Sequence, residues 1–398
     1  LLSLAGLPYT LKFLWAPIVD GIDIPVLSPW IGRRRAWMLA SQLLLMVAIV
    51  FLGTRDPLAA PLMIGLGAVL VAAASATQDI VIDAYRVESL GLDEQAAGMA
   101  SYVAAYRIGM LVSGAGVVGL TAWLEAKGLG KATTWPIAYG VCALLVMVGM
   151  LAVAFGREPV SQPRAVVISA AARKRSNARV RVWMAAKGAF AEFLGQDAAI
   201  AVLLFVVFYK LCDALAGAMT GPFVLAGLGY DKATYAGIVK GVGLAALLVG
   251  GFAGGFVARA LSLTQAMWLG AVLQMLSNGA FIWLGWQETS VWALTVAIVV
   301  ENFAGAIGTV IFVAYLSALC RNPLHTATQY ALLTAMASTG RTFLSSGTGF
   351  AAQAIGWPLF FLGTILAAVP SLILLAWLQR RGHFSGLAGS NAQTTEIP

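Results

Sequence analysis

The sequence has few charged residues for its length. Its 398 residues include 25 Lys or Arg and 17 Asp or Glu, 11% of the chain, against roughly 25% in an ordinary soluble domain. Hydrophobic residues supply 60%, which is more than one soluble core of this size can bury. The composition excludes a disordered chain and a typical cytosolic enzyme, and it predicts an all-α polytopic membrane protein.

Cysteine and histidine are also scarce. The three cysteines, Cys142, Cys212 and Cys320, lie in or at the ends of apolar runs. Their odd number and spacing fit no disulfide framework, zinc motif or redox motif, so we expect free packed thiols. The two histidines, His325 and His383, lie in polar segments, and no HExxH sequence occurs, so we expect no metal site.

Two further kinds of sequence feature are missing. No cleavable signal peptide is visible, and no GxxxxGK[ST] motif for ATP phosphates occurs. The longest polar stretch, residues 156–197, is too short for a nucleotide-binding domain. We therefore expect a carrier that uses the proton motive force, with no cofactor and no metal.

Apolar runs long enough to cross a bilayer, about 20 residues, dominate the chain. Eleven are visible: 1–19, 36–53, 60–84, 97–122, 135–155, 198–220, 235–257, 263–286, 290–319, 327–350 and 357–378. The first run starts without polar residues before it, and we expect that one helix precedes Leu1 in the natural protein. That would give two halves of six helices, an arrangement common in secondary transporters.

The basic residues orient these spans. The odd-numbered loops and the C-terminal tail hold 16 Lys or Arg, and the even-numbered loops hold 4. The positive-inside rule places the former in the cytoplasm, including the C-terminus. The net charge of +8 thus reflects membrane orientation, and we expect no binding to nucleic acid.

The same runs define the predicted domains. A first half-bundle covers residues 1–155 with five visible spans, and a second covers 198–378 with six. Between them lies a basic cytoplasmic linker, 156–197, whose 165–193 stretch is predicted to lie on the anionic inner leaflet. Residues 379–398 form a polar cytoplasmic tail.

Five charged residues lie near the middle of spans: Arg107, Lys210, Asp213, Glu301 and Arg341. Such charges are costly and mark functional sites by default. Lys210 and Asp213 share a helix face, either as a neutralising ion pair or with Asp213 exchanging a proton. Glu301 has no basic residue within four positions and is a candidate for proton coupling, or else a hydrogen-bonded structural acid. Arg107 and Arg341 suit a carboxylate or phosphate substrate, or neutralise the two acids.

A second group of charges lies at cytoplasmic span ends. Asp79, Asp83 and Arg86 follow one helical stripe, and Asp20 precedes a run of three arginines. Opposite charges at one membrane face are more typical of a gate than of a substrate site. The predicted cytoplasmic gate consists of Asp20, Arg33, Arg34, Arg35, Asp79, Asp83 and Arg86.

Several stretches resemble a known family. Ala16–Asp20 followed by Gly32–Arg35 resembles the loop signature of the major facilitator superfamily, with a longer insertion between them. Other stretches resemble one branch, the AmpG-type muropeptide permeases. They are Lys12–Pro17, Gln78–Ala84, Tyr106–Gly114, Tyr209–Ala214, Glu301–Phe303, Ala327–Leu333 and Ser338–Arg341.

The resemblance implies a transporter rather than an enzyme, monomeric and in the bacterial inner membrane. It implies proton-driven import of N-acetylglucosaminyl-1,6-anhydro-N-acetylmuramyl peptides from periplasm to cytoplasm, in cell-wall recycling and β-lactamase induction. Arg107, Lys210 and Arg341 would bind this substrate, and Glu301 and Asp213 would couple it to protons. One alternative is a carrier of another anionic metabolite such as acetyl-coenzyme A. A membrane acyltransferase is the alternative from another class, and no histidine within a span supports it.

Overall fold

The structure, a computed structural model, describes residues 6–56, 59–159, 178–195, 198–320, 322 and 324–387. Among these residues every regular element is a helix, and nine helical stretches are long and apolar enough to cross a membrane. They are Arg33–Gly53, Pro61–Ser89, Glu94–Ala126, Lys131–Phe155, Ala199–Gly227, Lys232–Ala260, Leu263–Gly285, Val291–Leu319 and Trp357–Arg380. The predicted all-α polytopic fold is confirmed.

The other two predicted runs, 1–19 and 327–350, do not form single long apolar helices among the described residues. The first is divided into α1 (Leu7–Leu11), a 3-10 turn (Lys12–Leu14) and α2 (Ala16–Gly21), with Pro8 and Pro17 opening the two α-helices, where a residue without an N–H is tolerated. The run at 327–350 becomes α18 (Thr326–Leu344) and α19 (Thr348–Ile355). Threonine, serine and glutamine make α18 too polar to stand among the nine.

The chain folds into two compact units. Unit 1 comprises Leu1–Ser89, Tyr106–Glu192 and Cys320–Ala335, and unit 2 comprises Leu90–Ala105, Phe193–Leu319 and Met336–Pro398. The helices α6 (Leu92–Leu111) and α18 each supply residues to both units. The half-bundle boundaries at 155 and 198 stay a prediction.

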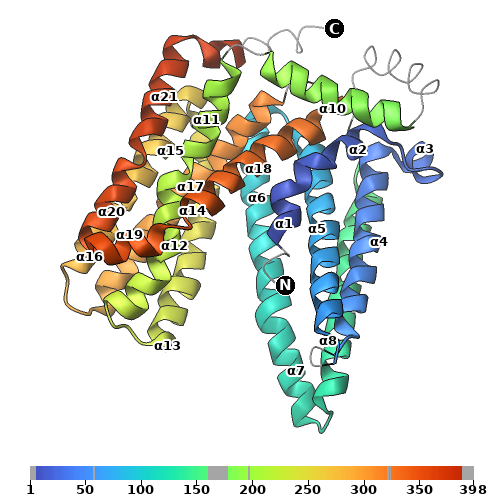
Figure 1. The fold of residues 1–398 in the computed structure, drawn as a ribbon, viewed down its shortest axis with the longest axis horizontal. Coiled ribbons are helices and arrows are strands. Elements are labelled where there is room, and N and C mark those ends of the chain that lie inside the picture. Colours follow the sequence, from blue (N-terminus) through green and yellow to red (C-terminus); the bar gives the residue numbers. More distant parts are fainter. Residues whose placement is uncertain are drawn as a thin grey trace. The chain divides into compact units, whose positions relative to one another are not determined.

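Unit 1 is built around α4 (Arg33–Gly53), which lies beside α5 (Pro61–Ser89) and α8 (Lys131–Phe155), as Figure 1 shows. α3 (Leu27–Ile31) precedes α4, and a π-helical turn (Val112–Gly116) precedes α7 (Val117–Ala126). At the end of α4, a Cβ on Gly53 would lie 2.2 Å from Cβ of Tyr139 in α8. Glycine at this position therefore sets how closely the two helices approach.

Unit 2 is built around α17 (Val291–Leu319), which packs most extensively against α14 (Gly243–Ala260) and α15 (Leu263–Ser277). A Cβ on Gly250 would lie 2.5 Å from the Phe303 carbonyl oxygen, and one on Gly254 would lie 3.0 Å from the α-carbon of Ile307. This GxxxG pair places two backbones in contact, as small residues do between membrane helices. The remaining helices are α11 (Ala199–Tyr209), α12 (Leu211–Pro222), α13 (Lys232–Thr234), α16 (Gly279–Gly285), α20 (Trp357–Leu366) and α21 (Val369–Arg380), with π-helical turns at Phe223–Gly227 and Tyr235–Val242.

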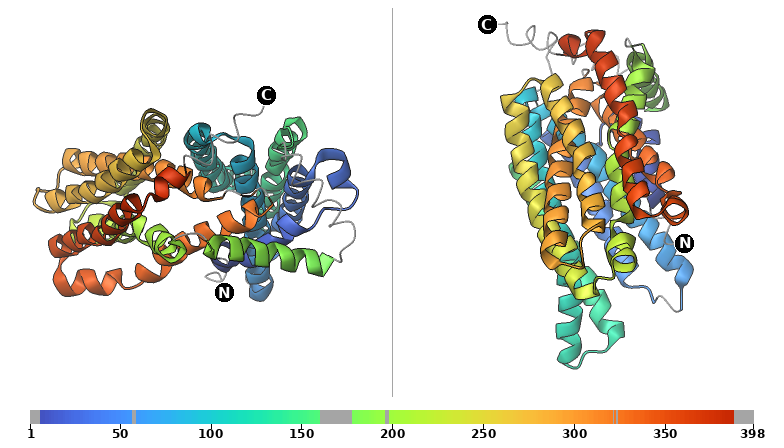
Figure 2. Two further views of the ribbon diagram at one scale, coloured as in Figure 1. Left: turned by 90° about the horizontal axis from the view of Figure 1, so that it is seen from above. Right: turned by 90° about the vertical axis from the view of Figure 1, so that its left-hand side faces the viewer.

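The basic linker contains α10 (Ala178–Leu194), which runs crosswise to α4 and α5 (Figures 1 and 2). Its Val182 backbone faces Gly21, and Arg181 lies 4.0 Å from Asp23. Trp183 is exposed, with the Lys187 ammonium 4.9 Å from its ring centroid. An exposed aromatic beside a cation fits the predicted position on a membrane surface, whereas residues 165–177 lie outside the described residues.

Candidate functional site

Lys210 lies at a break between two helices of unit 2. α11 ends at Tyr209 and α12 begins at Leu211, and the backbone of Lys210 itself leaves the helical region at φ −99° and ψ 7°. The Tyr209 ring stacks on Phe312 of α17 with ring centroids 4.9 Å apart, which holds this end of α11. The break directs the lysine side chain into the helix packing, where only 5% of the residue is exposed.

Four acceptors surround the Lys210 ammonium. Its Nζ donates to Asp213 Oδ2 at 2.5 Å and to Gln274 Oε1 at 2.6 Å. It also donates to Thr309 Oγ1 at 3.0 Å and to the Gly305 carbonyl at 3.4 Å. A buried ammonium is stable when it is paired and hydrogen-bonded in this way. Lys210 and Asp213 thus form an ion pair in unit 2, although the sequence left two interpretations open.

Asp213 keeps one oxygen available. Its side chain is 18% exposed, and Oδ1 makes no hydrogen bond within the described part of the chain. A carboxylate with one oxygen on a lysine and the other unbonded retains a site for a proton. The role of Asp213 in proton exchange therefore stays a prediction with a compatible geometry.

Glycines on α17 make room for this cluster. A Cβ on Gly308 would lie 2.1 Å from Nε2 of Gln274, and one on Gly305 would lie 3.1 Å from Oδ1 of Asp213. Any larger residue at position 308 would displace the glutamine that binds Lys210. No sequence signal indicated Gln274 or Thr309, because their approach to Lys210 depends on the packing of α15 and α17.

Glu301 lies on the same face of α17, one turn before Gly305 and two turns before Thr309. Its Oε2 accepts a hydrogen bond of 2.8 Å from the Asn302 side-chain amide. Asp213 and Lys210 are the charged groups that act on it electrostatically. Unit 2 therefore brings the three predicted residues Lys210, Asp213 and Glu301 into one electrostatic group.

A chain of charges in unit 1 begins at Lys12. Its Nζ lies 2.5 Å from Asp79 Oδ2 and 4.0 Å from Asp83 Oδ2. Asp83 lies 3.5 Å from Arg86, which donates a 2.8 Å hydrogen bond to the Tyr330 hydroxyl. The structure places Asp79, Asp83 and Arg86 together, as the helical stripe predicts. It adds Lys12, which lies in the first predicted apolar run and was not among the predicted gate residues.

A second buried ion cluster of unit 1 is centred on Asp20. Asp20 and Arg34 are 0% and 1% exposed, and Arg34 Nη2 lies 2.9 Å from Asp20 Oδ1. Arg34 also pairs with Glu88. The other oxygen of Asp20 accepts from the backbone N–H and the hydroxyl of Thr328 at 2.8 and 2.7 Å. Thr328 lies in the first turn of α18, where a carboxylate is favoured by the helix dipole.

The neighbouring arginines have separate partners. Arg33 donates to the backbone carbonyl of Asp20 at 2.8 Å, and Arg35 donates to the carbonyls of Val153 and Ala154, both at 2.9 Å. Glu158 caps α4 by accepting from the backbone N–H groups of Arg34 and Arg35. The predicted gate residues therefore form two clusters, and Glu88, Glu158 and Thr328 are members that the sequence did not indicate.

The two predicted arginines of the substrate site differ. Arg107, near the end of α6, makes no ion pair among the described residues of unit 1. Its Nη1 donates to Met110 Sδ at 3.7 Å, and its guanidinium carbon lies 5.9 Å from the Tyr106 ring centroid. Arg341 lies on α18, and its side chain falls outside the described residues. A substrate role for Arg107, Lys210 and Arg341 stays a prediction.

Three comparisons with known proteins agree with this architecture. Residues 2–329 match the model of the Major Facilitator Superfamily. The chain is 37% identical over 376 residues to the anhydromuropeptide permease of Escherichia coli K12, covering 94% of this chain and 71% of the relative. It is 33% identical over 380 residues to the Rickettsia felis protein named AmpG 4, covering 95% and 87%.

Solved structures share the fold at low sequence identity. The transporter FucP in its outward conformation matches with a TM-score of 0.67 at 12% identity, over 94% of this chain and 89% of that one. A bacterial homologue of ferroportin in an outward-facing state matches with a TM-score of 0.60 at 13% identity, over 95% and 90%. The relatives are transporters, not enzymes. The chain is a multi-pass membrane transporter that belongs to the Major Facilitator Superfamily and is a relative of the AmpG-type permeases.

Proposed function

We propose that the chain imports anhydromuropeptides from the periplasm to the cytoplasm by proton symport across a bacterial inner membrane. The observation that carries this proposal is the 37% identity over 94% of the chain to the anhydromuropeptide permease of E. coli. Uptake of such fragments would serve cell-wall recycling and, where the bacterium has one, induction of a β-lactamase. The chain would act as a monomer with its C-terminus in the cytoplasm.

The electrostatic group of unit 2 supports the proton coupling. Glu301 faces an ion pair whose lysine is already satisfied by four acceptors, and among the side chains that the structure describes Glu301 makes no salt bridge of its own. Protonation removes its negative charge from a site of low dielectric. A carboxyl with these surroundings can take up a proton on one side of the membrane and release it on the other, and Asp213 Oδ1 offers a second position for it.

The cations have different roles in this proposal. Lys210 is held by protein acceptors and keeps the coupling site together. Arg107, without an ion pair among the described residues, is the better placed to meet a peptide carboxylate, with Arg341 as its predicted counterpart. The Asp20–Arg34 and Lys12–Asp79 clusters would close and open the cytoplasmic side as their ion pairs form and break.

Transport in proteoliposomes tests this function. Labelled anhydromuropeptide and an imposed pH gradient should give accumulation with the wild type. Glu301→Gln should abolish accumulation and retain exchange, because the amide cannot carry a proton but occupies the same space. Glu288→Gln, an exposed carboxylate outside the spans, is the matched control and should transport normally.

Two results would contradict the proposal. Accumulation by Glu301→Gln at the wild-type rate would remove Glu301 from coupling. Competition by acetyl-coenzyme A, with no uptake of the anhydromuropeptide, would assign the chain to a different anionic cargo.

A further inference from the structure

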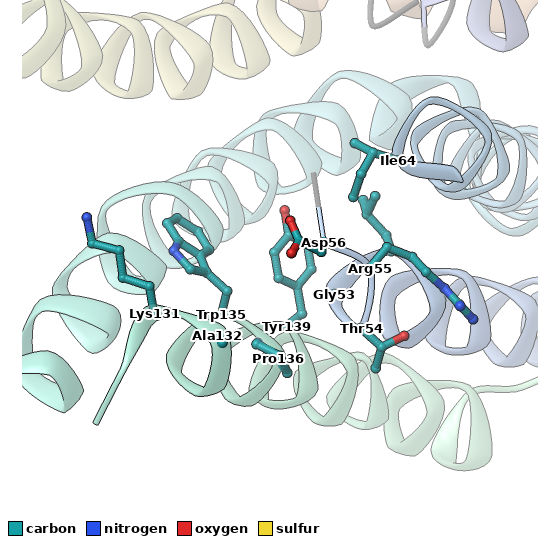
Figure 3. Close-up of a pocket in the computed structure, with 11 residues that line it drawn as sticks. Gly53, Thr54, Arg55, Asp56, Ile64, Lys131, Ala132, Trp135, Pro136 and Tyr139 are labelled. Atoms are coloured by element: carbon teal, nitrogen blue, oxygen red, sulfur yellow. The ribbon is translucent and has the colours of Figure 1, made fainter. Parts of the chain in front are cut away.

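Unit 1 contains a pocket that none of the predicted site residues line. It has a volume of about 600 Å³ and lies where α4 ends and α8 begins, and we call it the α4–α8 pocket. Its polar and aromatic lining residues are Thr54, Arg55, Asp56, Lys131, Trp135 and Tyr139 (Figure 3). The volume lies within the range of about 300–1,000 Å³ that is usual for small-ligand sites.

The middle of the α4–α8 pocket combines aromatic rings with hydrogen-bond acceptors. The rings of Trp135 and Tyr139 lie 6.3 Å apart at 45°, and Asp56 is a further lining residue, drawn between the two ends of the pocket in Figure 3. Pro136, inside α8, has no N–H to give to the Ala132 carbonyl one turn earlier. Aromatic faces, a carboxylate and a carbonyl that receives no hydrogen bond from residue 136 suit a cation that carries N–H donors.

The two ends of the pocket favour a negatively charged group, whereas its middle favours a cation. Arg55 and Lys131 lie at opposite ends in Figure 3, and the Arg55 guanidinium is held 4.6 Å from the Phe51 ring centroid. Cations on either side of a carboxylate suit a ligand whose positive group is followed closely by an anion. The charge pattern therefore fits a zwitterion rather than a simple anion.

The pocket also lies at the depth of the membrane surface. α4 ends at Gly53 and α8 begins at Lys131, so its residues sit at span ends, where lipid headgroups and aromatic belts occur. Leu43, Val47 and Val50 are exposed along α4 and share a face with Thr54. This apolar stripe provides a path for an acyl chain that leads to the pocket.

We propose that the α4–α8 pocket binds the headgroup of a phospholipid that carries a primary ammonium next to its phosphate, as phosphatidylethanolamine does. The ammonium would lie between Asp56, Trp135 and the Ala132 carbonyl, and the phosphate beside Lys131. A Cβ on Gly53 would lie 2.2 Å from Cβ of Tyr139, so the Tyr139 side chain starts in direct contact with the end of α4. The proposal does not depend on which cargo the protein carries.

Native mass spectrometry of the full chain in detergent, titrated with single lipids, tests the proposal. Phosphatidylethanolamine should bind about tenfold more tightly than phosphatidylglycerol, because only the former places N–H donors on Asp56. Phosphatidylcholine, whose ammonium has no N–H, should bind more weakly than phosphatidylethanolamine. Asp56→Asn should remove the preference over phosphatidylglycerol, and Trp135→Ala should weaken phosphatidylethanolamine about fivefold.

Trp286→Ala, another exposed tryptophan beyond a span end, is the matched control and should leave lipid binding unchanged. Thermal unfolding of each variant separates a lost site from a lost fold, and Trp135→Ala provides a second variant if Asp56→Asn fails to fold. Equal binding of the three lipids would overturn the proposal. So would displacement of the lipid by N-acetylglucosamine, which would make the pocket a sugar site.

Discussion

Replacing Asp213 with asparagine should destabilise the protein more than any other single change in the coupling site. The substitution keeps the shape of the side chain but removes the negative charge 2.5 Å from Lys210 Nζ. Gln274, Thr309 and the Gly305 carbonyl remain as acceptors, and none of them carries a charge. The ammonium, with a side chain 6% exposed, then loses its hydrogen-bonded counter-ion, and Glu301 is the remaining carboxylate of the group.

The magnitude follows from that burial. Removing one partner of a buried ion pair costs about 3–5 kcal/mol, whereas replacing both partners with neutral side chains of similar volume is often neutral. We therefore expect Asp213→Asn to lose about 3 kcal/mol of unfolding free energy, at the low end because the Asp213 side chain is partly exposed. Lys210→Met combined with Asp213→Asn should recover about 2 kcal/mol of that loss.

Unfolding of the purified chain in mixed micelles, with SDS as the denaturant, compares the two variants with the wild type. Transport provides the second readout, since the double variant should be stable and still unable to accumulate cargo. If Asp213→Asn unfolds within about 0.5 kcal/mol of the wild type, the ion pair contributes nothing to stability and this reasoning about Lys210 is refuted.

Three further outcomes are expected. Gly308→Ala should lower stability and transport together, because its methyl group takes the position of Gln274, while Gly251→Ala, which meets open space, should be silent in both assays. Arg34→Met should lower the free energy of unfolding by about 3–5 kcal/mol because the buried Asp20 and the partly exposed Glu88 lose their cation, and denaturant unfolding compares it with Arg34→Lys. Hydrogen bonds from a threonine hydroxyl and two backbone amides hold the pKa of Asp231 below its usual value. The contribution of Asp231 to folding stability is therefore present above the pKa of this group in the unfolded chain, and it is lost as the pH falls through the pKa in the folded chain. Unfolding curves of the wild type and Asp231→Ala should converge at low pH.

The sequence predicted the membrane class and most of the spans because both depend on local composition. A run of about 20 apolar residues is sufficient to form a spanning helix wherever it occurs. The prediction failed to give continuous spans where the 3-10 turn at Lys12–Leu14 and Pro17 divide the first run and where threonine and glutamine enrich α18. Both exceptions contain residues of the candidate site, such as Lys12 and Thr328, whose polar contacts replace apolar burial.

The candidate site was predicted in part. Lys210, Asp213 and Glu301 were identified because they are charged residues near the middle of apolar runs. Burying an ionised group in the bilayer costs free energy, so such positions stand out in the sequence alone. The pairing of Lys12 with Asp79, 67 residues away, and of Asp20 with Thr328, 308 residues away, could not be read from spacing. Neither could the α4–α8 pocket, whose lining comes from the ends of separate helices.

By itself the sequence determined that this protein lies in a membrane, that its helices carry a few costly charges and that it resembles one family of transporters. These properties depend on composition and on short motifs. Only the tertiary structure decided which charges neutralise one another, because ion pairs at 2.5–4.0 Å require helices distant in the chain to lie side by side. Glycines at 53, 250, 254 and 308 permit that approach, and their role becomes visible only when the neighbouring helix is in place.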